Sequence, residues 1–89
     1  MTRLFVRHPV SDFAQWKNVY DGFDDERRGM GVTDAAVYQA ADNPNDVTVL
    51  HDFVSLQAAQ AFVESPRLRE VMDSAGVAGA PTIWFTEPV

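Results

Sequence analysis

Short apolar segments separated by turn residues recur along the chain, and their composition predicts four β-strands. The first segment stops at Pro9 and the last before Pro88, where proline has no amide to donate to a strand partner. A dense turn signal, Asp-Asn-Pro-Asn-Asp at residues 42–46, separates the two middle segments and predicts a hairpin. The second segment is the weakest, because four of its nine residues are small or acidic. The predicted strands are residues 2–8, 32–40, 47–53 and 82–87.

The first predicted helix follows Pro9 and has one apolar face. Ser11 or Asp12 can cap its N-terminus, and the Gly-Met-Gly sequence at residues 29–31 ends it. Gly22 lies inside this helix and favours a kink or a close contact there. Aromatic residues recur at steps of three and four, which is the spacing of a helix packed on a core. They are Phe13, Trp16, Tyr20 and Phe23.

Two further helices are predicted after the hairpin. Ser55 can cap the first of them, and Ser65 followed by Pro66 interrupts it and starts the second, which Gly76 ends. Each has an apolar face that can pack against a sheet. The inward residues are Leu56, Ala59, Phe62 and Val63 in one helix, and Leu68, Val71, Met72 and Ala75 in the other.

The predicted order, β-α-β-β-α-α-β, places the chain in the α+β class. Two right-handed crossovers around one four-stranded antiparallel sheet give a ferredoxin-like sandwich. The first and third strands should then lie in the centre of the sheet, with the second and fourth outside them. We expect residues 1–89 to form a single domain.

Apolar side chains point to both faces of the predicted strands. Leu4 and Val6 point to one face and Phe5 to the other, and Ile83 and Trp84 divide in the same way. Helices in this fold cover one face, so the other would expose a larger apolar patch than soluble monomers usually show. We therefore expect a homodimer in which the two sheets pack face to face. A monomer that tolerates these exposed side chains is the alternative.

Composition narrows the functional classes. The 89 residues include no cysteine and carry a net charge of −6, which excludes thiolate chemistry and argues against nucleic acid as a partner. No apolar stretch approaches the roughly 20 residues that span a bilayer, and no signal-peptide segment is evident at the start. We therefore expect a cytoplasmic protein that binds neither nucleic acid nor membranes.

Four polar side chains on the predicted central strands are candidates for catalysis. His8 and His51 share the face of the dominant apolar residues, so they approach each other or line one cavity, where imidazole is a natural general base. A structural role in the core or the dimer interface is the alternative for both. Arg7 and Asp52 share the opposite face. They form either a salt bridge between strands or a pair in which Asp52 orients Arg7 toward a carboxylate or enolate oxygen.

Aromatic side chains are candidates for substrate binding. Four of them could line a pocket between the first helix and the sheet, and ordinary core packing is the alternative. They are Trp16, Tyr20, Tyr38 and Trp84. The two histidines and Asp52 lack recognisable metal-ligand spacing, so no metal site is predicted. The charged run at residues 24–28 indicates a solvated helix face.

Three segments resemble the dimeric α+β barrel superfamily, especially its small antibiotic-biosynthesis-monooxygenase-type proteins. They are Arg-His-Pro-Val-Ser-Asp-Phe-Ala-Gln-Trp-Lys at residues 7–17, Asp-Asn-Pro-Asn-Asp-Val at residues 42–47, and Phe-Val-Glu-Ser-Pro-Arg-Leu at residues 62–68. The resemblance covers essentially the whole chain. It implies the fold and the dimer but no single reaction, because the superfamily includes cofactor-independent oxygenases, cyclases, isomerases and haem enzymes.

The resemblance also bears on cofactors. Haem-degrading relatives use a helix histidine as the iron ligand, and the second predicted helix, residues 55–64, contains none. We therefore expect no cofactor. Three functions fit these residues: a cofactor-independent monooxygenase, cyclase or isomerase that acts on an aromatic or polyketide-like substrate with His51 or His8 as base; a non-catalytic binder of a small ligand; and an accessory dimer with no pocket.

Overall fold

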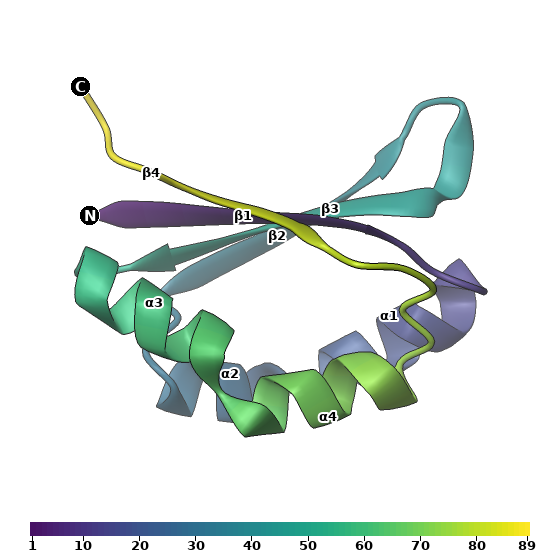
Figure 1. Cartoon of the computed structure of the whole chain (residues 1–89), viewed down its shortest axis with the longest axis horizontal. Coiled ribbons are helices and arrows are strands. Elements are labelled where there is room, and N and C mark those ends of the chain that lie inside the picture. Colours follow the sequence, from purple (N-terminus) through teal and green to yellow (C-terminus); the bar gives the residue numbers. More distant parts are fainter.

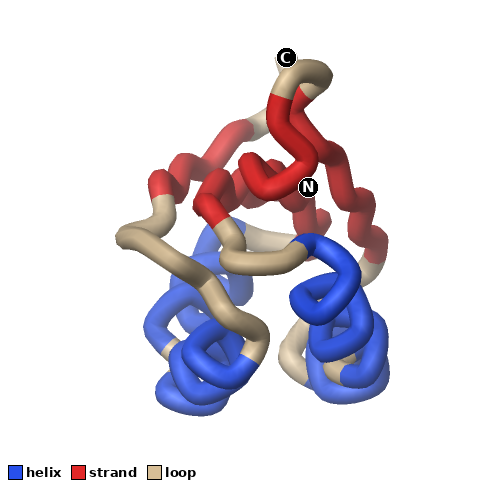
Figure 2. The backbone as a smooth tube through the Cα atoms, turned by 90° about the vertical axis from the view of Figure 1, so that its right-hand side faces the viewer, coloured by secondary structure: helices blue, strands red, loops and turns tan.

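The computed structural model describes all 89 residues and confirms the ferredoxin-like α+β fold (Figure 1). The antiparallel sheet has the order β2-β3-β1-β4, so the first and third strands are central, as predicted. Helices lie in two groups beneath one face of the sheet (Figure 2). None of them has the length and apolar composition needed to cross a membrane. The elements are β1 (Thr2–Pro9), α1 (Phe13–Gly22), α2 (Asp24–Gly29), β2 (Asp34–Ala40), β3 (Asn43–Phe53), α3 (Leu56–Glu64), α4 (Pro66–Ser74) and β4 (Thr82–Thr86).

Strand β3 begins at Asn43, inside the segment that the sequence predicts as a turn. Two contacts hold this segment extended. The backbone carbonyl of Asn45 accepts a hydrogen bond from the amide of Val10 at 2.8 Å, and its side-chain Oδ1 accepts one from the amide of Phe13 at 3.1 Å. The hairpin between β2 and β3 is therefore tighter than predicted, and a register shift between Gln39 and Ala40 accommodates it.

The first predicted helix is two helices, which confirms the kink expected near Gly22. Helix α1 ends at Gly22 and α2 begins at Asp24, with Phe23 between them. Asp12, rather than Ser11, caps α1, because its side chain accepts a hydrogen bond from the amide of Ala14 at 3.3 Å.

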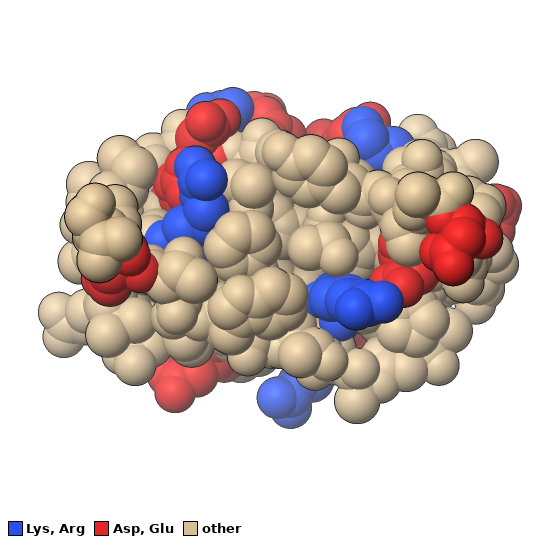
Figure 3. Space-filling model, turned by 90° about the horizontal axis from the view of Figure 1, so that it is seen from above, with Lys and Arg blue, Asp and Glu red and all other residues tan.

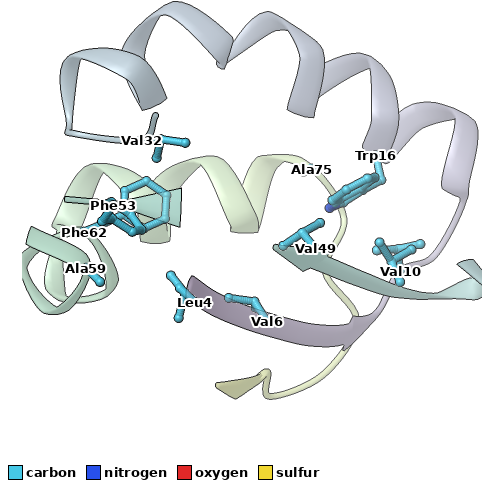
Figure 4. Packing of buried hydrophobic residues seen from close by; sticks show 11 residues of the cluster. Leu4, Val6, Val10, Trp16, Val32, Val49, Phe53, Ala59, Phe62 and Ala75 are labelled. Atoms are coloured by element: carbon cyan, nitrogen blue, oxygen red, sulfur yellow. The ribbon is translucent and has the colours of Figure 1, made fainter. Parts of the chain in front are cut away.

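The hydrophobic core lies between the helices and the face of the sheet that carries Leu4, Val6 and Val49 (Figure 4). These strand residues share one face because alternate residues of β1 and β3 point to the same side and the register of the two strands aligns them. The buried cluster also includes residues from the helices and connecting segments. Its members are Leu4, Val6, Val10, Trp16, Val32, Val47, Val49, Phe53, Ala59, Phe62 and Ala75.

The opposite face of the sheet is not covered by helices and has an apolar row across its middle. Ala36, Leu50, Phe5 and Trp84 are neighbours in consecutive strands, and the rings of Phe5 and Trp84 stack with centroids 5.2 Å apart. Seen from this side, uncharged atoms fill the centre, with charged groups around them (Figure 3). The two-sided apolar pattern predicted from the sequence is therefore confirmed.

A matched pair of valine substitutions tests this division between core and surface. We expect Val47→Ala to lower the free energy of unfolding by about 2 kcal/mol, because it removes buried methyl groups and leaves a cavity. Val47 is fully buried, whereas Val54 is 74% exposed, so Val54→Ala should change stability by less than about 0.5 kcal/mol. Urea denaturation at one protein concentration measures both. Equal losses for the two variants would contradict the assigned core.

Candidate functional site

A cavity of about 540 Å³ lies between the covered face of the sheet and the two groups of helices. Fifteen of its twenty-two lining residues are hydrophobic, so it suits an apolar ligand. Strands β1 and β3 contribute Val6 and Val49, and α4 contributes Leu68, Val71 and Met72 from the opposite side. The polar residues that border this space come from β1, β3, the first two helices and α4.

A hydrogen-bonded pair joins the helical layer to the sheet at the wall of the cavity. The hydroxyl of Tyr20, on α1, lies 3.0 Å from Nε2 of His51, on β3. Burial raises the pKa of the Tyr20 hydroxyl, so this group keeps its proton at neutral pH. Either the hydroxyl donates to Nε2 or the Nε2–H group donates to the hydroxyl, depending on the imidazole tautomer.

His51 is a neutral imidazole in the folded protein. The residue is only 3% exposed, and burial together with the positive charge of Arg27 lowers its pKa to about 4. Its second ring nitrogen, Nδ1, is buried and has no hydrogen-bond partner. The ring also meets Phe62 edge to face, with centroids 5.2 Å apart. His51 therefore has one nitrogen bound to Tyr20 and one free.

Arg27 corrects the sequence-based prediction that residues 24–28 form a solvated helix face. Its residue is only 3% exposed and borders the cavity. The guanidinium lies 3.7 Å from the centre of the Tyr20 ring, and its Nη1 donates to the Tyr20 carbonyl at 2.6 Å. The spacing Phe13, Trp16, Tyr20, Phe23, Arg27 continues the apolar face at steps of three and four. That spacing is the signal that could have identified Arg27.

His8 borders the same cavity farther along β1. It is buried, its ring approaches that of Trp16 with centroids 5.7 Å apart, and its Nδ1 has no hydrogen-bond partner. Burial lowers its pKa. His51 lies opposite Leu4 in the sheet, so the two histidines are four positions apart, or roughly 13 Å along the strand direction. The sequence predicts that the two histidines either approach each other or line one cavity. They line one cavity and do not approach each other.

Arg7 and Asp52 do not form the predicted pair. Arg7 lies opposite Thr48 in the sheet and binds Asp46, with a shortest N–O distance of 2.6 Å. Asp52 lies opposite Arg3 and binds it at 2.8 Å, and this hydrogen-bonded guanidinium lowers the pKa of the Asp52 carboxyl. Both ion pairs lie on the uncovered face, where alternation in the strands places them, so neither Arg7 nor Asp52 lines the large cavity.

The predicted aromatic pocket contains only two of its four residues. Trp16 and Tyr20 line the cavity and stack with centroids 4.8 Å apart. Tyr38 and Trp84 point to the uncovered face of the sheet and are exposed. No group of three His, Asp or Glu side chains converges to hold a metal ion.

The fold is shared with solved structures. No protein-family model and no curated protein matches the chain. A crystal structure of an antibiotic biosynthesis monooxygenase superposes with a TM-score of 0.78 at 8% identity, covering 100% of this chain and 99% of the other. A Bordetella bronchiseptica protein named for the same class gives a TM-score of 0.83 at 15% identity, covering 99% and 96%.

A third structure is a variant of SnoaB, described as a cofactor-independent oxygenase from Streptomyces nogalater. It gives a TM-score of 0.76 at 12% identity, covering 98% of this chain and 91% of that one. These similarities confirm the antibiotic-biosynthesis-monooxygenase-like α+β fold that the three sequence segments resemble.

The low pKa of His51 makes stability depend on pH. An unfolded histidine titrates near 6.5, whereas folded His51 titrates near 4, so the unfolded chain binds more protons between these values. The stability linked to His51 is complete above pH 6.5 and falls by about 3 kcal/mol as the pH drops through 4. Urea unfolding at pH 7 and pH 4.5 should show most of this loss, about 2 kcal/mol.

The variant His51→Gln isolates this contribution. It should lose most of the pH dependence between 6.5 and 4, and the part due to His8 remains, because burial lowers the pKa of His8 too. NMR titration of the ring protons reads each histidine directly. A folded-state midpoint for His51 near 6.5 would contradict the site described.

Proposed function

We propose that the protein is a cofactor-independent enzyme of the monooxygenase, cyclase or isomerase type, acting on an aromatic or polyketide-like substrate. The observation that carries this proposal is the Tyr20–His51 pair, buried beside the Arg27 guanidinium at the wall of an apolar cavity. A base, a hydroxyl and a cation around an otherwise apolar space are the groups needed to form a carbanion or enolate.

The first chemical step is removal of a proton from an activated C–H or phenolic O–H group. Neutral His51 accepts this proton, and the new negative charge on the substrate oxygen is stabilised by Arg27. Burial and Arg27 hold the pKa of His51 at about 4, but an anion formed beside the ring attracts the imidazolium and raises that pKa. Because the cavity is apolar, these charge interactions are stronger than they would be in water.

Molecular oxygen can then react with the carbanion without a cofactor. For a methylene flanked by aromatic rings, the balanced reaction converts CH₂ and O₂ to a carbonyl and one water, so the substrate supplies all four electrons. Cyclisation or isomerisation of the same carbanion needs no oxidant. SnoaB is named a cofactor-independent oxygenase, and this likeness supports the oxygen route for the present chain.

The remaining cavity residues have binding roles in this proposal. Trp16 and Tyr20 stack on each other and give the cavity an aromatic wall that a planar substrate can contact. His8 provides a second polar group at the far end of the cavity. Arg27 takes the anion-stabilising role predicted for Arg7, because Arg7 lies on the other face of the sheet.

We also propose that the uncovered face of the sheet is the interface of a homodimer. In one copy Trp84 of the apolar row is 40% exposed and Tyr38, on the same face, is 57% exposed. Soluble monomers rarely leave a contiguous apolar patch in contact with water. Two copies related by a twofold axis would bury this row against itself. The ion pairs of Arg3 and Arg7 would then border the interface.

Oxygen consumption with 1,8-dihydroxyanthrone tests the catalytic proposal. We expect protein-dependent uptake of oxygen with formation of the anthraquinone, and a decrease of about 10²- to 10⁴-fold in kcat for His51→Gln, because the base is lost. Lys17→Gln is the control, since Lys17 is exposed on α1 and binds only Asp21.

A binding measurement on the same compound separates an enzyme from a non-catalytic binder. Calorimetry measures whether the anthrone binds to wild-type protein and to the His51→Gln variant. One outcome would overturn the proposed enzyme and favour the non-catalytic binder. In it, both proteins bind the anthrone, neither consumes oxygen, and cyclase and isomerase assays recover the test compounds unconverted.

Light scattering after size exclusion tests the dimer. We expect wild-type protein to have twice the chain mass of 9.9 kDa and Trp84→Glu to have the mass of one chain, because a buried carboxylate opposes association. Val54→Glu is the matched control: Val54 is also exposed but lies after the end of β3, so this variant should stay dimeric. A wild-type monomer at micromolar concentration would contradict the proposal.

A further inference from the structure

The cavity contains a buried cation that the surrounding protein neutralises only in part. The side chain of Arg27 is 4% exposed, and its carboxylate partner is Asp24 at 3.2 Å. Asp24 is 45% exposed and also binds Arg28 at 3.2 Å, so one solvated carboxylate serves two guanidinium groups. An isolated charge inside a protein is expensive unless it is paired and hydrogen-bonded.

The hydrogen-bonding capacity of Arg27 is also incomplete. Nη1 donates to the Tyr20 carbonyl and Nη2 to Asp24, but Nε is buried and has no partner. The chain has only two other buried side-chain nitrogens without partners, Nδ1 of His8 and Nδ1 of His51. All three belong to residues that border the same cavity. Unsatisfied buried polar groups are rare in native proteins, and their grouping here points to a polar group supplied by a ligand.

Other charges around the cavity do not cancel Arg27. Arg69 and Asp73 are the remaining charged lining residues; they have opposite signs, and both are exposed on α4. Arg27 is therefore the buried charge in the lining. The effect on His51 agrees with this, since the charge of Arg27 helps to lower the pKa of that imidazole.

We infer that the cavity selects ligands that carry an ionised oxygen on a flat apolar skeleton, and that Arg27 is the residue that determines this specificity. The ionised group is a carboxylate, or the enolate or phenolate of an acidic compound. This inference deepens the proposed function and rests on it in one respect, because it takes the cavity as the substrate site. Arg27 binds the oxyanion while Trp16 and Tyr20 contact the flat skeleton.

Two probes of the same shape test the charge selection directly. The carboxylate 2-naphthoate and the neutral amide 2-naphthamide share one ring system and differ in charge at neutral pH. We expect calorimetry on wild-type protein to show about tenfold tighter binding of the carboxylate, because hydrogen bonds to a charged acceptor are stronger than those to a neutral one. This comparison needs no variant, so it holds even where a substitution disturbs folding.

Variants of neighbouring arginines assign the selectivity to a residue. Arg27→Met keeps most of the side-chain volume and removes the charge, and it should bind the two probes equally. Arg28→Met is the matched control, because Arg28 shares the carboxylate of Asp24 but is exposed, and it should keep the preference. Arg27→Lys retains the charge without the planar fork and should restore part of the preference. Circular dichroism verifies that each variant is folded.

Several results would overturn the inference. These are equal affinities of wild-type protein for the two probes, no binding of either probe, or equal loss of selectivity in Arg27→Met and Arg28→Met. Its failure is distinguishable from failure of the proposed function. If the protein prefers the carboxylate but turns over no substrate, the proposed enzyme activity is wrong and the protein is an anion binder. If it consumes oxygen but does not prefer the carboxylate, only the role of Arg27 is wrong.

Discussion

The contact among Tyr20, His51 and Arg27 is the interaction on which the site depends. It ties α1 to the sheet through one hydrogen bond and holds α2 against α1 through the guanidinium that lies over the Tyr20 ring. Because these polar groups satisfy one another only in part, they remain able to bind a ligand. Loss of the Tyr20 hydroxyl would leave the buried imidazole of His51 without its hydrogen-bond partner, which costs more than the contact itself contributes.

The cavity on one face of the sheet and the uncovered apolar row on the other have the same cause: the chain has too few helical residues to cover both faces. Four short helices cannot fill all the space beneath the sheet, so a cavity of about 540 Å³ remains between them and strands β1 and β3. No helix is available for the other face, and its apolar row stays open. A chain this small thus combines an internal space for a ligand with an external face for a second copy, and one sheet supports both.

The strand alternation and the helix spacing in the sequence predict the fold well, because burial in two layers imposes them directly. The same alternation predicts that His8 and His51 share a face. It cannot predict which acid each arginine meets, since that depends on register: a displacement of four positions separates Arg7 from Asp52. Arg27 was missed for another reason. Charged residues next to it indicate solvent, although its spacing from Phe23 continues the apolar face of α1 and places this one side chain inward.

A crystal structure of the protein with bound 2-naphthoate would test the central claim most directly. We predict that the carboxylate lies within hydrogen-bonding distance of the Arg27 guanidinium, with the rings against Trp16 and Tyr20 and the Tyr20–His51 hydrogen bond nearby. A naphthoate bound only outside the cavity, or a cavity occupied with its carboxylate turned away from Arg27, would contradict it.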